Sequence, residues 1–191
     1  LTFRGQSLIG KSPHEVCLLG IGRTFQLARP FPHLTAAENL AVGVLYGNSG
    51  INSVGAALAE ARRLLAFVDL EDVADETPAR LTLAQRKRLA LARALATRPH
   101  LLLLDECVAG LNASETQAAV ELLRRIHRTM GLTMVIIEHV MPVVMNLSDR
   151  VIVLNNGRKI AEGRPSDVAA HPLVIEAYLG RRAAGAVRRE A

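Results

Sequence analysis

The second half of the chain alternates between short apolar runs and amphipathic segments. The runs 100–105 and 133–138 have the length and apolar character of buried strands, and 114–129 between them has the spacing of an amphipathic helix. A further strand is expected at 150–154, turning through Asn155-Asn156-Gly157 into a hairpin with 159–161. Strands that alternate with helices in this way are typical of an α/β fold built on a parallel sheet.

The region from about 35 to 97 shows only helical periodicity. Thr35 stands where it caps a helix, and a Gly/Ser/Asn-rich loop at 48–55 separates this helix from a second one at 56–68. The residues 82–97 form a strongly helical, arginine-rich segment. We therefore predict a helical insertion between the first short strands and the main sheet.

The first residues contain GQSLIGKS, Gly5–Ser12, which has the letters of the phosphate-binding P-loop, G-x-x-x-x-G-K-[ST]. Its context favours a turn and a helix cap. A P-loop follows a buried strand, whereas only the short strand Leu1–Arg4 stands ahead of Gly5. In Ser12-Pro13-His14-Glu15 the serine caps a helix, and Pro13 lacks the N–H that a phosphate cradle needs. Lys11 and Ser12 are therefore not counted as site residues.

Composition limits the classes of protein without selecting one. Half of the 191 residues are hydrophobic and 21% are charged, which is ordinary for a folded globular chain. Aromatic residues make up 3%, which argues against a base-stacking nucleic-acid surface. The net charge of +5 suits an anionic ligand, a membrane surface or a nucleic acid and does not decide among them. The two cysteines lack metal-site spacing, and no apolar run has the length of a membrane span.

Two carboxylates, Asp105 and Glu106, stand at the carboxyl end of the apolar run LLLL. Ligands bind at this edge of an open parallel sheet. An aspartate here can hold magnesium, usually through water, and the neighbouring glutamate can act on a water molecule. The alternative is a buried strand that ends in two solvated acids, and the pattern alone does not separate the two.

Polar residues also end the neighbouring extended segments. His139 follows the strand 133–138, from where it could donate to a γ-phosphate in the same cleft. Gln26 ends the extended segment 22–26, and its neutral amide can contact magnesium or an attacking water without adding charge. Each of these residues, taken by itself, is more often an ordinary surface polar group.

The segment Leu81–Gln85 opens the basic helix at 82–97. Thr82 caps that helix, whose first N–H groups are then available to an anion. The competing interpretation is an amphipathic helix with a basic outer face, and physical chemistry alone favours it.

Taken in order, several segments resemble the ATP-binding subunit of an ABC transporter: RTFQ, LTLAQRKRLALARALATRP, LLLLDECVAGLN, VIIEHVM and SDRVIVLNNGRKIAEGRP. More narrowly, the chain from Leu1 to about Gly180 is similar to the subunits that power branched-chain amino acid importers. The resemblance implies an α/β, P-loop NTPase-like core with a mainly parallel sheet and an inserted helical subdomain. It divides the chain into a partial core (1–34), the helical subdomain (35–97), the rest of the core (98–180) and a basic tail (181–191).

The resemblance also assigns roles by position. Gln26 takes the place of the Q-loop glutamine, which senses the nucleotide, contacts magnesium and faces the membrane subunits. Asp105 takes the place of the magnesium-associated Walker B aspartate. Glu106 becomes the general base for hydrolysis and His139 the switch histidine. The implied cofactors are ATP and Mg²⁺.

Leu81–Gln85 takes the place of the signature motif, which in this family binds the γ-phosphate of ATP held by the other subunit. Asn112 lies in the implied D-loop, which contacts that subunit. The common signature is L-S-G-G-Q, and here Thr82 keeps a hydroxyl while Gln85 keeps the amide. Leu83 and Ala84 carry Cβ atoms where glycine would let the backbone approach phosphate closely.

The implied partners are membrane-spanning permease subunits, a second ATP-binding subunit (the same chain or a paralogue) and, indirectly, a substrate-binding protein. They imply a peripheral position at the cytoplasmic face of the cell membrane, and no nucleic acid is expected. A further hypothesis is an ABC-type ATPase that acts on DNA or ribosomes. The chain lacks a long coiled-coil insertion and an aromatic-basic patch, and both absences argue against this hypothesis.

The family's P-loop precedes its Q-loop by a full helix and further strands, but fourteen positions separate Ser12 from Gln26. The resemblance therefore implies a true P-loop ahead of Leu1 and an N-terminally incomplete core. It leaves open an alternative in which the chain is a truncated, non-catalytic interaction module that binds ATP poorly.

Overall fold

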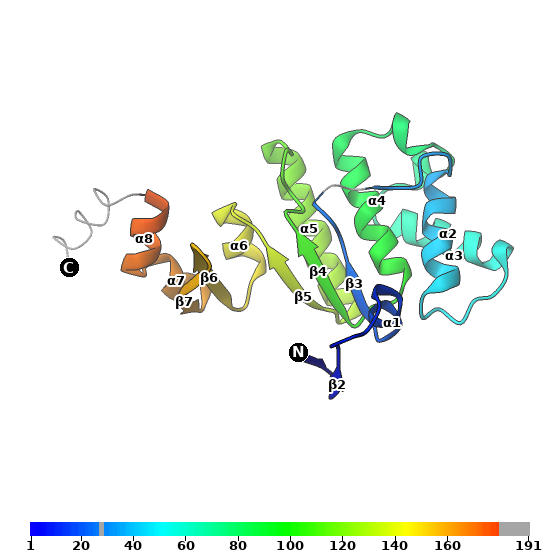
Figure 1. Ribbon diagram of the computed structural model, residues 1–191. Coiled ribbons are helices and arrows are strands. Elements are labelled where there is room, and N and C mark those ends of the chain that lie inside the picture. Colours follow the sequence, from blue (N-terminus) through cyan, green and yellow to red (C-terminus); the bar gives the residue numbers. More distant parts are fainter. Residues whose placement is uncertain (27–28, 180–191) are drawn as a thin grey trace. The chain divides into compact units, whose positions relative to one another are not determined.

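The computed structural model describes residues 1–26 and 29–179 (Figure 1). The chain divides into two compact units, Leu1–Ile137 and the residues from Glu138 onward, and each is described by itself. The predicted basic tail, 181–191, lies outside the described residues.

A parallel sheet forms the centre of the first unit. Its strands are β3 (Ile21–Arg23), β4 (Leu101–Asp105) and β5 (Thr133–Ile137), in the order β3-β4-β5. Both neighbours run parallel to β4, and Asp105 stands opposite Ile137 in the β4–β5 register. The predicted α/β class and the parallel sheet are confirmed.

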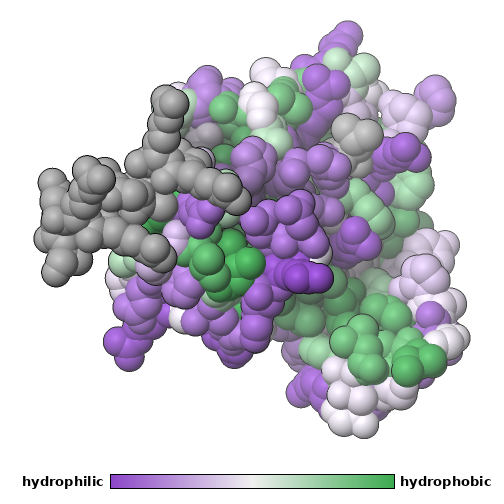
Figure 2. Space-filling view, turned by 60° about the vertical axis from the view of Figure 1, so that its left-hand side comes forward, coloured by the Kyte–Doolittle hydropathy of each residue, from purple (hydrophilic) through white to green (hydrophobic). Residues whose placement is uncertain are grey.

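Two long helices cover one face of this sheet. They are α4 (Leu83–Ala96) and α5 (Ala113–Met130), and together with Leu104 they enclose a common cavity. Leu102 and Leu104 are 0% and 1% exposed. On the other face Val135 and Ile137 are 51% and 62% exposed. Hydrophobic residues at the molecular surface appear in Figure 2 as green areas among hydrophilic ones. The prediction of fully buried strands is therefore wrong in detail, because among the described residues helices cover β4 on one face.

Every element between 35 and 97 is helical, as predicted. The chain runs through α2 (Ala36–Tyr46), α3 (Val54–Phe67) and two 3₁₀ turns, Glu71–Val73 and Pro78–Arg80, into α4. In Figure 1, α2 and α3 lie beyond α4 as seen from the sheet, and α2 and α3 both contact α4. Buried Asn39 on α2 accepts from Phe31 N–H and donates to the carbonyl of Leu34, so it ties the proline-rich loop to the helices.

The first residues form a small hairpin where a single strand was expected. Strands β1 (Thr2–Phe3) and β2 (Gln6–Ser7) pair antiparallel around a turn at Arg4-Gly5, where Gly5 takes a φ of +79°. The helix α1 (Pro13–Leu18) follows, with Leu19 as its C-cap, and the next residue, Gly20, takes a φ of +96° that suits glycine.

The second unit contains α6 (Met141–Leu147), β6 (Val151–Asn155), β7 (Arg158–Gly163), α7 (Pro165–Ala169) and α8 (Pro172–Leu179). The predicted hairpin is confirmed, with Asn156 and Gly157 at φ 48° and 75° in the turn. Its core is Val153, Ala161, Val168 and Val174. The strand–helix alternation suggested that β6 continues the parallel sheet; in the described residues it pairs antiparallel with β7 instead.

Among the residues that the structure describes, no helix combines the length and apolar character required to cross a lipid bilayer.

Leu102→Ala should lower the free energy of unfolding by about 2–5 kcal/mol, because it leaves a cavity under the helices that cover β4. The matched control is Leu18→Ala, at a leucine that is 45% exposed. Urea denaturation of both variants checks this prediction. Equal losses in the two variants would contradict the placement of Leu102 in the core.

Candidate functional site

The carboxyl ends of the three parallel strands meet at one edge of the sheet. Thr24 follows β3 and continues the pairing, since its N–H donates to the carbonyl of Leu103 at 2.9 Å. Its hydroxyl accepts from the N–H of Asp105 at 3.4 Å. The Asp105 carboxylate lies 3.7 Å from the Arg23 guanidinium, and both side chains are partly exposed. Asp105 is therefore held at the strand end beside a cation that solvent screens.

The backbone of Glu106 is constrained by its conformation and by hydrogen bonds on both sides. Its φ of 45° lies in the left-handed region, which non-glycine residues adopt rarely and often at functional sites. Its N–H donates to the carbonyl of Ile137 at 3.0 Å, so β5 holds the start of the turn. Its own carbonyl accepts from Ala109 N–H at 3.2 Å and from the Lys87 ammonium at 3.0 Å.

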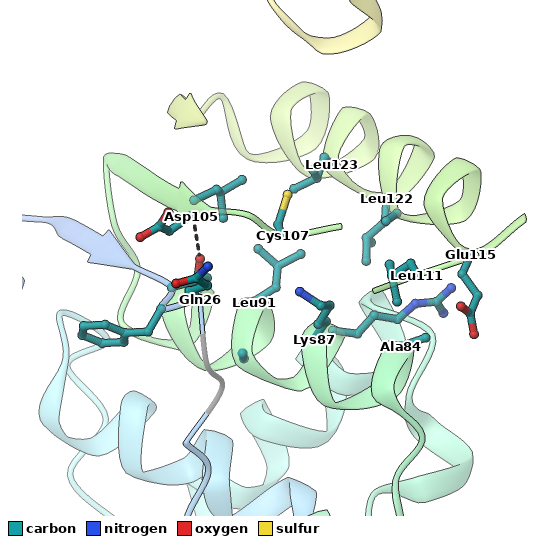
Figure 3. A pocket seen from close by; sticks show the side chains of 16 residues that line it. Gln26, Ala84, Lys87, Leu91, Asp105, Cys107, Leu111, Glu115, Leu122 and Leu123 are labelled. Atoms are coloured by element: carbon teal, nitrogen blue, oxygen red, sulfur yellow. Dashed lines mark hydrogen bonds between the residues drawn. The ribbon is translucent and has the colours of Figure 1, made fainter. Parts of the chain in front are cut away.

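The structure brings the side chains of Gln26 and Glu106 together. Gln26 Nε2 donates to Glu106 Oε2 at 2.5 Å, although eighty positions separate the two residues. Figure 3 shows Gln26 next to Asp105 at one end of the cavity between α4 and α5. Because the Gln26 nitrogen faces Glu106, its amide oxygen is left to face other ligands.

These donors suit magnesium. Carboxylate and amide oxygens are hard ligands, and Mg²⁺ binds proteins through one or two carboxylates together with waters and phosphate oxygens. Within 1–26 and 29–179 no cluster of three or more His, Cys, Asp or Glu side chains could hold a metal ion by itself. The edge of the sheet thus fits a cation that arrives with a phosphate ligand.

The start of α4 is built by a capping box. Thr82 Oγ1 accepts from Gln85 N–H at 3.2 Å, and the Gln85 side chain accepts from Thr82 N–H at 2.9 Å. The predicted cap at Thr82 is confirmed, and the Gln85 side chain is engaged in it. The Thr82 hydroxyl proton still has no acceptor among the described residues, and the same holds for the N–H groups of Leu83 and Ala84. These three donors form an anion-facing helix terminus.

Leu83 and Ala84, which stand where the common signature has glycine, direct their side chains away from the start of α4, each toward a different neighbour. Ala84 lines the cavity between α4 and α5, opposite Leu111 and Glu115 (Figure 3). Leu83 is 45% exposed and reaches toward Gly110, where an added Cβ would stand 3.1 Å from Leu83 Cδ2. Gly110 also has a φ of +78°, so a side chain at this position would be strained on both counts.

The basic face of α4 differs from the amphipathic interpretation. That interpretation placed the charged residues after Gln85 on an outer, solvated face, and Arg86 is indeed exposed. Lys87 is partly buried, lines the cavity and donates to Glu106. Neither Lys87 nor Arg23, which lies beside Asp105, is among the site residues predicted from the sequence. A helical wheel anchored on buried Leu91 would have placed Lys87, one turn earlier, on the inner face.

Asn112 caps α5. Its side-chain oxygen accepts from Glu115 N–H at 2.9 Å and from the Ser114 hydroxyl at 2.8 Å, and the Glu115 carboxylate accepts from Asn112 N–H. The capping role was not anticipated, because the helix was expected to start at Ser114. Contact of Asn112 with a second subunit stays a prediction.

His139 belongs to the second unit. It stands two positions after Ile137, the residue that pairs with Asp105 in the register of β4 and β5. Its role at a γ-phosphate stays a prediction.

The segment Gly5–Ser12 does not form a phosphate cradle. Ser12 Oγ accepts from Glu15 N–H at 3.3 Å, and Glu15 accepts from Ser12 N–H at 2.7 Å, which completes a capping box ahead of Pro13. The Ser12 N–H, and then its hydroxyl, hold the pKa of the Glu15 carboxyl below its usual value. The predicted turn and cap are confirmed, and α1 has six residues rather than the length of a P-loop helix.

An ATP-binding cassette is the class of protein that this fold and site define. The family described as "ABC transporter" matches residues 2–109, and "Branched-chain amino acid ATP-binding cassette transporter" matches residues 158–184. The chain belongs to the ATP-binding subunits of ABC transporters, of the branched-chain amino acid type.

Individual relatives agree with this membership. The branched-chain amino acid transport ATP-binding protein BraF of Pseudomonas aeruginosa is 35% identical over 92% of this chain and 74% of its own. LivG of Escherichia coli K12 is 35% identical over 94% of this chain and 75% of its own.

Solved structures show the same fold. MJ1267, an ATP-binding cassette of an ABC transporter, superposes with a TM-score of 0.77 at 29% identity, over 92% of this chain and 75% of its own. MJ0796, a dimer bound to ADP and phosphate, superposes with a TM-score of 0.75 at 26% identity, over 85% of this chain and 72% of its own.

Ser12→Ala should lower the free energy of unfolding by about 1 kcal/mol, the usual weight of a lost N-cap. Lys11→Met should leave the affinity for ATP unchanged, because the segment serves as a turn and a cap. Urea denaturation and calorimetric titration with ATP and magnesium check the two variants. A tenfold or larger loss of ATP affinity in Lys11→Met would restore the P-loop interpretation.

Proposed function

We propose that this chain is the ATP-binding and ATP-hydrolysing subunit that energises an ABC importer for branched-chain amino acids or related amino acids and amides. The observation that carries the proposal is the contact of Gln26 with Glu106 beside Asp105, at the carboxyl end of β4. The relatives whose names specify branched-chain amino acid transport support the choice of substrate class.

Each residue predicted to take part in catalysis has a distinct task in this proposal. Asp105 and the amide oxygen of Gln26 would hold magnesium, which would neutralise phosphate charge when bound. Glu106 takes a proton from the water whose oxygen attacks the γ-phosphorus, while the bond to the leaving ADP oxygen breaks. His139 donates to the γ-phosphate. A positioned general base contributes about 10²–10⁴-fold to the rate.

A second subunit completes the site. MJ0796 is dimeric with ADP and phosphate bound. In the proposed dimer the Thr82 hydroxyl and the N–H groups of Leu83 and Ala84 face the γ-phosphate of ATP held by the other subunit, and Gln85 maintains the cap. Asn112 lies at the contact between subunits. Membrane-spanning permease subunits then keep the assembly at the cytoplasmic face of the membrane.

A second candidate is a non-catalytic interaction module. The capping box at Ser12 favours it, because Gly5–Ser12 offers the phosphates no cradle. Such a module would keep the surfaces for the other subunits and bind ATP poorly.

Calorimetric titration of the intact protein with ATP and magnesium separates the two candidates. A dissociation constant in the micromolar range supports the ATPase. Absence of binding at millimolar ATP contradicts it and favours the module.

Glu106→Gln should reduce hydrolysis by about 10²–10⁴-fold and leave ATP affinity unchanged, because the amide keeps the shape of the carboxylate and cannot accept the proton. The matched control is Glu121→Gln, at a carboxylate on α5 that is 56% exposed. Phosphate release under saturating ATP measures both variants. Unchanged hydrolysis in Glu106→Gln would remove Glu106 from the mechanism.

A further inference from the structure

Lys87 connects the helix α4 to the backbone of Glu106. Its ammonium donates to the carbonyl oxygen of Glu106 at 3.0 Å in a part-buried position. Lys87 lies in the middle of the cavity in Figure 3, between the Gln26–Asp105 end and the Ala84–Glu115 end. Because the donor is charged and partly shielded from water, this hydrogen bond is stronger than one between neutral groups.

A second contact joins the same helix to the same loop. Leu83 reaches toward Gly110, four positions beyond Glu106. Leu83 and Lys87 stand four positions apart on α4, so they lie on one side of the helix, one turn from each other. That side of α4 therefore holds the loop 106–111 near both of its ends.

The loop needs such support, because its first residue has an unfavourable backbone conformation. Glu106 keeps its left-handed φ of 45° while its N–H is tied to Ile137 and its carbonyl to Ala109 and Lys87. Of these partners, Lys87 is the one that comes from α4. Movement of α4 relative to the sheet thus acts on Glu106 through the Lys87 side chain.

We propose that Lys87 is a positioning residue that links the first turns of α4 to the loop 106–111, so that the two segments move together. An anion that binds the Thr82–Gln85 terminus then changes the placement of the Glu106 carboxylate in the same chain. In a dimer, ATP held by one subunit thereby sets the general base of the other subunit's own ATP. This catalytic consequence rests on the proposed function, whereas the link between α4 and the loop does not.

Hydrogen–deuterium exchange on the full chain without nucleotide tests the link. Lys87→Met should raise exchange of the amides in 106–111 by about tenfold, the effect of losing a hydrogen bond from a charged donor. Exchange in α2 should stay unchanged. Lys87→Arg should restore protection, because a guanidinium also donates to a carbonyl.

Arg86→Met is the matched control for exchange, since Arg86 is the exposed neighbour on α4 and makes no hydrogen bond or ion pair within the described residues. Circular dichroism confirms that each variant is folded, and Lys87→Gln replaces Lys87→Met if the latter unfolds. Unchanged exchange in folded Lys87→Met, or an equal rise in Arg86→Met, would overturn the proposal.

Steady-state hydrolysis tests the catalytic consequence. Lys87→Met should lower kcat by about tenfold, with KM for ATP within about twofold, because the base is misplaced and nucleotide binding is untouched. Lys87→Arg should recover most of kcat. Altered exchange together with an inactive unaltered chain would support the link and contradict the proposed function. Altered exchange with unchanged kcat would overturn the catalytic consequence.

Discussion

The parallel pairing of β4 between β3 and β5 is the constraint on which the rest of the site depends. Parallel strands end at the same edge, so Thr24, Asp105 and Ile137 come together through backbone hydrogen bonds alone. Glu106 leaves this edge with its N–H still tied to β5. Segments distant in the chain then supply the other partners, Gln26 from the loop after β3 and Lys87 from α4. The sheet sets where the carboxylates are, and the loop and helix set how Glu106 is oriented.

Arg23 and Asp105 form an ion pair at this edge of the sheet, but their side chains are not fixed by it. Arg23 lies 3.7 Å from Asp105, but its side chain is 54% exposed and also lies over the Phe25 ring, 4.9 Å from its centroid. An exposed ion pair of this kind is weak and easily exchanged. Arg23 can therefore compensate Asp105 while no cation is present and give way when one binds.

Local patterns predicted the local structure well. The caps at Ser12, Thr35 and Thr82 and the Asn156-Gly157 turn depend on residues within a few positions of each other, and the structure has all of them. The Gln26–Glu106 contact joins residues eighty positions apart, and no local pattern in the sequence predicts that they meet. The direction of Lys87 could be obtained from helical phase, but only once Leu91 is known to be buried. The half-covered sheet and the separate pairing of β6 depend on tertiary packing, which periodicity does not report.

The segment Leu81–Gln85 is consistent with an anion site because a helix terminus offers backbone donors whatever side chains follow. The N–H groups of Leu83 and Ala84 belong to the first turn of α4 and remain available while Thr82 and Gln85 maintain the cap. Ala84 turns its methyl group into the cavity, and Leu83 lies toward Gly110. A leucine at 83 therefore depends on a glycine at 110, whose φ of +78° and missing Cβ leave room for it. The side chain of Leu83 is thus accommodated by the loop that carries Glu106, so the start of α4 and this loop pack against each other.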